Sequence, residues 1–213
     1  MDRRRPFLSV IVPTIGRSTL PRALDSIRRQ VDPTEVEILV VGDSHGASGT
    51  LIGDCGRLAE VAASFEARYL EHDGGRHMVG HPQRNAGLRI ATGAWLAFLD
   101  DDDVWTDDAY RLIAARIAKQ PDAVHLFRMR YPPGSEPVVL WATPVVAEDN
   151  VGTPMIVVRN RPELLGVWGD RYAGDFDFIS TTVEKHVARR PGDAEPANPV
   201  AWWPDVICDI RPS

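Results

Sequence analysis

Lysine is almost absent from this chain of 213 residues. Lys119 and Lys185 are the only lysines among its 24 basic residues, and all the others are arginines. Residues 13–17, which follow the first predicted strand, lack the glycine-rich, lysine-containing phosphate loop that a sugar nucleotidyltransferase needs. That absence argues against such an enzyme. The arginines carry forked donors that suit phosphate oxygens.

Cysteines are few, and long apolar runs and an excess of basic charge are absent. Cys55 and Cys208 could pair only once, which excludes a disulfide framework and favours a reduced, cytoplasmic protein. No stretch approaches the roughly 20 apolar residues of a membrane span, and residues 1–12 make no convincing signal peptide. The formal net charge of -6 and the pI of about 5.5 argue against general nucleic-acid binding.

Short apolar runs alternate with segments of helical periodicity over the first 120 residues. The runs predict buried strands at residues 8–12, 36–41, 67–70 and 94–99. Helices are predicted at residues 20–31, 51–64, 82–91 and 107–117, with Ser18 or Thr19 and Thr106 as N-caps. This order predicts an α/β fold with a mostly parallel central sheet flanked by helices.

The second half has a different pattern. Further strands and a last helix are predicted at residues 123–131, 138–141, 155–158 and 175–187. After Arg190 the sequence shows no clear period. We therefore expect a smaller, mixed β half that continues the same single domain, because no linker is long enough to divide the chain.

Four consecutive aspartates, Asp100 to Asp103, follow the apolar run at 94–99. Like charges repel, so a folded protein keeps such a run most readily where a cation neutralises it. In an extended chain Asp100 and Asp102 would point to one side and Asp101 and Asp103 to the other. The alternation predicts a pair of hard oxygen ligands at the carboxyl end of a strand. The alternative is a solvated acidic loop or helix N-terminus.

Other polar clusters are predicted to meet the aspartates. Residues 14–17 and 43–45 follow two further strands, whose carboxyl ends share one edge in a doubly wound sheet. Residues 81–87 open a helix, and helix N-termini attract anions, to which Arg84 adds a guanidinium. Acids for a cation beside donors for phosphate suit a metal–diphosphate.

Four segments carry a family resemblance: LSVIVPTIGR, EILVVGDS, QRNAG and AWLAFLDDDDVW. In order and spacing they resemble the family 2 glycosyltransferases with the GT-A fold. The resemblance implies one GT-A domain over 1–213, with a donor half at about 7–120 and an acceptor half at about 121–213. It also implies metal-dependent, inverting transfer from a nucleotide diphosphate sugar, with a UDP-sugar favoured, to the hydroxyl of an unknown acceptor.

The resemblance also implies roles for individual residues. Nucleotide-sugar contacts are expected from Pro13, Thr14, Arg17, Asp43, Arg84, Asp100 and Asp101. Asp43 is expected to contact the base, although Gly42 stands where many members have a second acid. Asp102 is expected to ligate Mn or Mg on the diphosphate. The alternatives are a helix cap for residues 14–17, a turn at Asp43 and a surface ion pair for Arg84.

Inverting transfer needs a carboxylate that removes the proton of the acceptor hydroxyl. Residues 174–177, Gly-Asp-Phe-Asp, resemble the family's Gly-Glu-Asp segment, with Phe176 interposed. Asp175 is therefore the favoured catalytic base and Asp177 the alternative. Asp175 could instead be a helix N-cap.

Late in the chain, two features remain ambiguous. His186 resembles an extra metal ligand of some family members, but a lone histidine on a helix is more often structural or exposed. Trp202 and Trp203 could stack on a sugar, or they could lock the sheet through apolar packing.

Two other function classes compete with glycosyl transfer. A pair of aspartates after a strand also serves aspartyl-phosphate chemistry in phosphohydrolases. Here, however, Val104 stands where such an enzyme has Thr or Ser. A non-catalytic nucleotide-sugar-binding or calcium-binding module is the other class. The aspartate run lacks the glycine and the final glutamate of an EF-hand.

Overall fold

The computed structural model describes residues 5–43, 55–72, 79–189 and 199–212. Within these residues the strands form one nine-stranded sheet. They are β1 (Leu8–Thr14), β2 (Val36–Asp43), β3 (Arg68–His72), β4 (Trp95–Phe98), β5 (Val104–Trp105), β6 (Val124–Arg130), β7 (Val139–Leu140), β8 (Ile156–Arg159) and β9 (Val200–Asp209).

The sheet changes winding direction between β1 and β4. Its strand order is β3-β2-β1-β4-β8-β6-β9-β5, with β7 beside β6. Strands β3, β2, β1 and β4 are all parallel, whereas β8 is antiparallel to β4 and β6. The chain moves from β1 toward β3 and then returns to the other side of β1 to form β4. In such sheets, ligands bind at the carboxyl ends of the strands where the direction changes.

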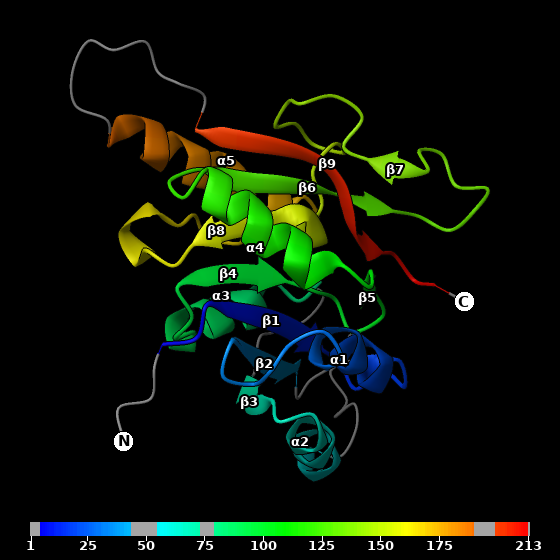
Figure 1. Ribbon diagram of the computed structural model, residues 1–213. Coiled ribbons are helices and arrows are strands. Elements are labelled where there is room, and N and C mark those ends of the chain that lie inside the picture. The colour runs from blue at the N-terminus through cyan, green and yellow to red at the C-terminus, as the bar shows by residue number, and fades with distance from the viewer. Residues whose placement is uncertain (1–4, 44–54, 73–78, 190–198, 213) are drawn as a thin grey trace.

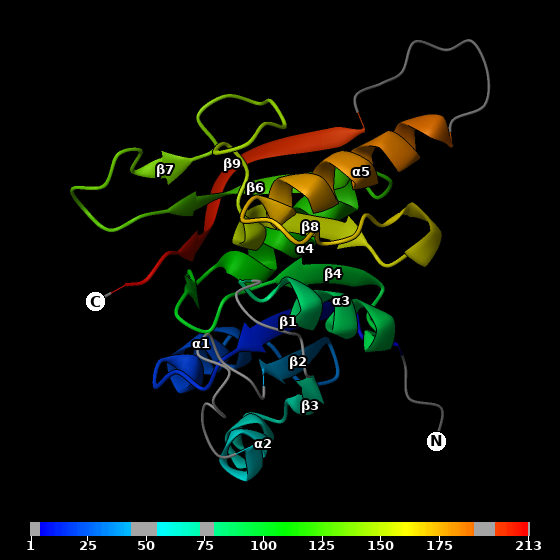
Figure 2. The ribbon, with the colours of Figure 1, turned by 180° about the vertical axis from the view of Figure 1, so that it is seen from behind.

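Helices cover both faces of this sheet (Figures 1 and 2). They are α1 (Leu20–Arg28), α2 (Cys55–Ser64), α3 (His81–Ile90), α4 (Ala109–Lys119) and α5 (Gly174–Ala188), with short 3-10 turns at Thr153–Met155 and Pro162–Leu164. Helices α1 and α4 lie on one face, and α3 and α5 lie on the other. Every residue of β1 and β4 is buried as a result, which explains why these strands are mostly apolar rather than alternating.

The predicted α/β fold is confirmed, and the predicted strands and helices of the first half are present with ends shifted by a few residues. Residues 51–54 of the second predicted helix lie outside the described part of the chain. Thr19 is the N-cap of α1, as predicted, but its side chain makes no capping hydrogen bond. The predicted cap Thr106 is wrong, because the N-cap of α4 is Asp108 and the Thr106 hydroxyl donates to the carbonyl of Val206.

Strands β5 and β9 were not predicted. In β9 the residues Trp202 to Asp205 mix aromatic, proline and acidic side chains, so no period of two is visible. Its pairing with β6 also shifts register between Leu126 and Arg128. The strand is therefore stabilised by long-range pairing with β6 and β5 rather than by a local pattern.

The two tryptophans of β9 lock the second half of the sheet, as the apolar-packing alternative predicted. Trp203 stacks on His125 of β6 with an interplanar angle of 13°, and its indole N–H donates to His125 Nδ1 at 2.9 Å. Trp202 packs edge-to-face against Trp141 at 5.2 Å. These contacts join β9 to β6 and to the residue that follows β7 through aromatic packing.

Two bulk expectations also meet the structure here. Of the helices in the described ranges, none has the length and apolar character to cross a membrane. Cys208 is a free, buried thiol in β9, whereas the side chain of Cys55 lies outside the described part of the chain.

His125 makes the stability of the sheet depend on pH. Burial lowers the pKa of this imidazole from 6.5 to about 4, and the Arg116 and Arg159 guanidiniums lie over its neighbours Trp203 and Trp95. The folded state therefore holds the neutral ring, while the unfolded chain binds a proton below about pH 6.5. Stability should fall as pH drops from 6.5 to 4, by on the order of 3 kcal/mol from this group.

Urea unfolding of the wild type and of His125→Gln across this pH range tests the prediction. The unfolding free energy of the variant should decline less steeply than that of the wild type. Parallel declines in the two proteins would assign the pH dependence to other groups.

Candidate functional site

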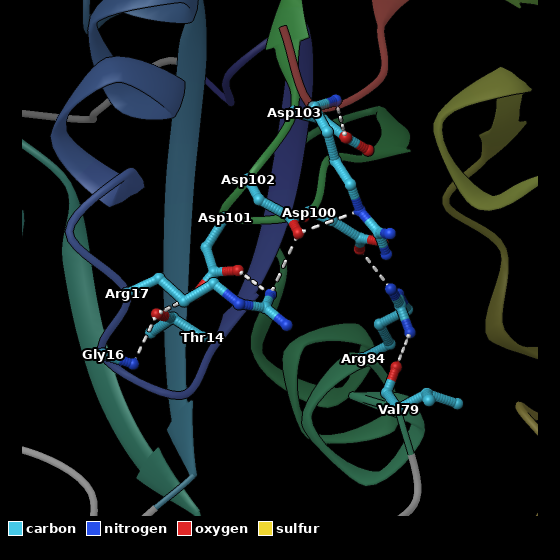
Figure 3. Close-up of polar contacts among 10 residues, drawn as sticks. Thr14, Gly16, Arg17, Val79, Arg84, Asp100, Asp101, Asp102 and Asp103 are labelled. Atoms are coloured by element: carbon cyan, nitrogen blue, oxygen red, sulfur yellow. Dashed lines mark hydrogen bonds and ion pairs between the residues drawn. The ribbon is translucent and has the colours of Figure 1, made fainter. Parts of the chain in front are cut away.

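The predicted site residues gather at the carboxyl ends of β1 and β4, beside the first turn of α3 (Figure 3). β1 delivers Thr14 and the loop to Arg17, and β4 delivers the four aspartates. α3 contributes Arg84 from the side of the cluster opposite Arg17. This edge is where the sheet changes direction, as the strand order predicted.

Asp101 is the buried anchor of the cluster. Its carboxylate accepts a hydrogen bond from the Thr14 hydroxyl at 2.6 Å and another from the Arg17 guanidinium at 2.6 Å. The Thr14 hydroxyl also accepts the backbone N–H of Gly16 at 3.0 Å. Burial raises the pKa of Asp101, and the bonds from Thr14 and Arg17 oppose that rise. The alternative in which these residues merely cap α1 and face solvent is wrong for Thr14, which is buried, whereas the Arg17 side chain is exposed but bonded to Asp101.

Asp103 lies with Asp100 and Asp102 rather than with Asp101. One carboxylate oxygen of each of these three residues lies within 4.8 Å of the others. The predicted alternation is wrong because β4 ends at Phe98 and the chain turns, with the N–H of Asp103 donating to the carbonyl of Asp100 at 3.1 Å. Burial, then the charge of Asp100, raises the pKa of Asp103 to about 8.

These three carboxylates fit a divalent cation. Mg and Mn prefer hard oxygen ligands, and the mutual repulsion of three converging acids favours any cation that enters among them. Asp100 and Asp102 are partly exposed, whereas Asp103 and Asp101 are buried. We name Asp100, Asp102 and Asp103 the acidic cluster. Asp103 is the member that the sequence placed wrongly.

Arg84 holds Asp100 in place from beneath. Its side chain is only 2% exposed, pairs with the Asp100 carboxylate and donates to the carbonyl of Val79 at 2.8 Å. The guanidinium also lies 4.9 Å from the ring centre of Trp168. The surface ion pair offered as an alternative for Arg84 is therefore wrong, because this pair is buried on the arginine side.

His81 supports Arg84, which the sequence did not indicate. Its Nδ1 lies 3.2 Å from an Arg84 nitrogen and its Nε2 lies 3.1 Å from the carbonyl of Arg171. The ring stacks on Trp168 at 5.6 Å. Burial, then the charge of Arg84, lowers the pKa of His81 to about 4. The neutral ring can thus accept from Arg84 through Nδ1 and donate to the Arg171 carbonyl through Nε2.

Asp175 and Asp177 differ in their partners. Burial raises the pKa of Asp175, which is also influenced by the nearby charges of Arg84 and Asp100. The Asp177 carboxylate instead accepts hydrogen bonds from the Arg171 guanidinium, with N···O distances of 2.5 to 3.0 Å. The N-cap of α5 is Ala173, so the capping alternative for Asp175 is wrong. Asp175 is the carboxylate of this pair that is electrostatically coupled to the aspartate edge.

The remaining predicted residues are placed as follows. Asp43 ends β2 opposite His72 of β3, and residues 44–54 beyond it lie outside the described chain, so its base contact stays a prediction. A side chain at Gly42 would require the Tyr69 ring to move. His186 Nδ1 bonds to the carbonyl of Thr182 in its own helix, at 2.8 Å, outside the acidic cluster.

Comparisons with known proteins agree with this architecture. A family model described as glycosyl transferase family 2 matches residues 9–144. A Haemophilus influenzae protein described as an uncharacterized glycosyltransferase is 24% identical over 162 residues, which are 73% of this chain and 49% of that protein. This chain therefore spans about half the length of that relative.

Solved structures share the GT-A fold. S. aureus TarS has a TM-score of 0.69 at 20% identity, and the match covers 95% of this chain and 36% of TarS. The structure of TarS 1–349 in complex with UDP-GlcNAc has a TM-score of 0.66 at 18% identity, and the match covers 95% of this chain and 57% of that one. A third structure is that of the mannosyltransferase PcManGT from Pyrobaculum calidifontis in complex with GDP-Man and Mn2+. It has a TM-score of 0.64 at 22% identity, and the match covers 96% of this chain and 56% of PcManGT.

Thr14 should contribute to stability through Asp101. In Thr14→Val the buried Asp101 loses a donor with no water to replace it, which should lower the unfolding free energy by about 1–3 kcal/mol. Thr14→Ser keeps the hydroxyl, so its unfolding free energy should fall much less. Urea unfolding without added metal or nucleotide measures both variants. Equal losses in Val and Ser would mean that the methyl group, not the hydrogen bond, matters at this position.

Proposed function

Because this chain belongs to glycosyl transferase family 2, we propose that it transfers a sugar from a nucleotide diphosphate sugar to an acceptor hydroxyl. The acidic cluster at the carboxyl end of β4 is the observation that carries this proposal. It stands at the edge where α/β sheets bind their ligands. The family match also favours transfer over phosphohydrolase, nucleotidyltransferase and non-catalytic binding alternatives.

Asp102, with Asp100 and Asp103, is proposed to hold Mg or Mn at this edge. A divalent cation bound there supplies positive charge that stabilises the diphosphate as a leaving group. Arg84 fixes the Asp100 carboxylate, and His81 fixes Arg84. Such support keeps the ligands in place before the donor arrives. The PcManGT structure, in complex with GDP-Man and Mn2+, supports the assignment.

Contacts to the donor are proposed from the loop after β1 and from the end of β2. Pro13, Thr14 and Arg17 line the β1 edge, and Asp43 ends β2 beside it. Asp101 contributes by holding Thr14 and Arg17. The TarS structures with UDP and with UDP-GlcNAc support a UDP-sugar as the donor.

Asp175 is proposed as the catalytic base. Its carboxylate accepts the proton of the acceptor hydroxyl while the hydroxyl oxygen bonds to the anomeric carbon. The bond from that carbon to the diphosphate oxygen breaks in the same step. Attack opposite the leaving group inverts the anomeric configuration. The raised pKa of Asp175 makes it a stronger base than a solvent-exposed aspartate, and Asp177 is committed to Arg171.

Nucleoside diphosphates with Mn2+ should raise the melting temperature of the wild type, because they bind the folded state. At ligand concentrations about 100-fold above Kd, a rise of about 5 °C or more is expected. Asp102→Asn should abolish the Mn2+-dependent part of this rise. Asp107→Asn, at an exposed aspartate paired with Arg29, is the matched control and should behave as the wild type. A panel of nucleoside diphosphates that leaves the wild type unchanged would contradict the proposed function.

Asp175→Asn should separate binding from transfer. Loss of the base should slow sugar transfer by about 10²- to 10⁴-fold, while nucleoside diphosphate affinity stays near that of the wild type. The rate of sugar transfer is measured as the release of nucleoside diphosphate from the donor, with a panel of acceptors or with water as the acceptor. Full activity in Asp175→Asn together with inactive Asp177→Asn would move the role to Asp177.

A further inference from the structure

Arg211, just after β9, lies against the acidic cluster. Its backbone N–H donates to Asp103 Oδ1 at 2.9 Å, and its side-chain Nε lies 3.2 Å from Asp102 Oδ2. Asp102 is the carboxylate proposed above as the cation ligand. In this structure an arginine of the chain itself therefore neutralises that ligand.

The fold builds this contact from segments 108 residues apart. β5 directly follows the aspartates, and its Val104 pairs with Asp209 of β9. The Arg130 guanidinium holds the Asp209 carboxylate at 2.7 and 2.9 Å, and the N–H of Ile210 donates to the carbonyl of Arg130 at 2.8 Å. These contacts of Asp209 and Ile210 hold the backbone of the next residue, Arg211, beside Asp103 without help from the Arg211 side chain.

The backbone of Arg211 is itself unusual. Its φ of 41° lies in the left-handed region, which residues other than glycine rarely adopt. Such strain persists only where surrounding contacts impose it, and it gathers at functional sites. Here the anchored N–H of Arg211 imposes it and directs this residue to the acidic cluster.

The side chain of Arg211 is held much less firmly than its backbone. It is 74% exposed, and exposed ion pairs are weak. Arg17 also approaches Asp102 Oδ2, at 3.4 Å, but it is tied to the buried Asp101 by a 2.6 Å bond. Of the two guanidiniums that the described residues place on this oxygen, that of Arg211 can exchange its partner at lower cost.

We propose that Arg211 is an internal counter-ion that moves between two anions of the donor site. In the ligand-free protein it neutralises Asp102. When a divalent cation takes its place, the guanidinium turns to the diphosphate of the donor, whose oxygens suit its forked donors as well as a carboxylate does. This inference rests on the proposed function, because it uses the same cation and diphosphate.

The exchange predicts opposite effects of one substitution. In Arg211→Gln, Mn2+ alone should bind up to about fivefold more tightly, because a competing exposed charge has left Asp102. A nucleoside diphosphate in saturating Mn2+ should bind about tenfold or more weakly, because a charge-assisted bond is lost. Arg211→Lys keeps the charge and should show a smaller change in both measurements.

Mn2+ binding is measured by electron paramagnetic resonance of the free ion, and UDP or GDP binding by calorimetry in saturating Mn2+. Arg111→Gln, which removes an exposed arginine paired with Asp108 on α4, is the matched control. Circular dichroism confirms that each variant is folded.

Tighter Mn2+ binding with weaker nucleotide binding in Arg211→Gln supports the exchange. No change in either affinity, or a change of both in the same direction, overturns it. If the wild type itself binds no nucleoside diphosphate with Mn2+, the proposed function fails instead. The two failures are therefore distinguishable.

Discussion

Repulsion among four consecutive aspartates is the constraint on which the rest of this site depends. The turn after β4 brings the oxygens of Asp100, Asp102 and Asp103 within 4.8 Å of one another at the end of a buried strand. Unpaired charges in such a place are costly. Each carboxylate is therefore met by a partner drawn from a distant part of the chain.

Those partners divide the aspartates into different roles. Thr14 and Arg17 satisfy Asp101 in the interior, so that residue anchors the loop after β1. Buried Arg84, backed by His81 and Trp168, fixes Asp100.

The partners of Asp102 are of another kind. Asp102 meets two guanidiniums, of Arg17 and Arg211, which are both partly or largely exposed. Arg211, the more exposed of the two, is the partner that a cation can replace at lower cost, which agrees with the proposal that Asp102 is a metal ligand.

Local sequence predicted the frame of this site well. The apolar runs of β1 and β4 and the helices between the strands follow from short-range patterns, and the winding of parallel strands brings 14–17, 84 and 100–103 to one edge. The prediction failed where geometry departs from an extended chain. The turn at 100–103 moved Asp103 into the acidic cluster.

It also failed where contacts are long-range. β9 has no visible period, and the place of Arg211 follows from the pairing of β9 with β5. The support of Arg84 by His81 requires two side chains of one helix turn to meet Trp168 from a segment far along the chain. Sequence spacing alone carries no signal for such contacts.

Crystals grown with Mn2+ and UDP test the central claim most directly, through anomalous diffraction from manganese. The account predicts one strong manganese peak in contact with the Asp102 carboxylate and with the diphosphate oxygens, and UDP at the carboxyl ends of β1 and β4. Nucleotide bound at that edge with no manganese at the acidic cluster, or manganese and nucleotide bound elsewhere, would contradict it.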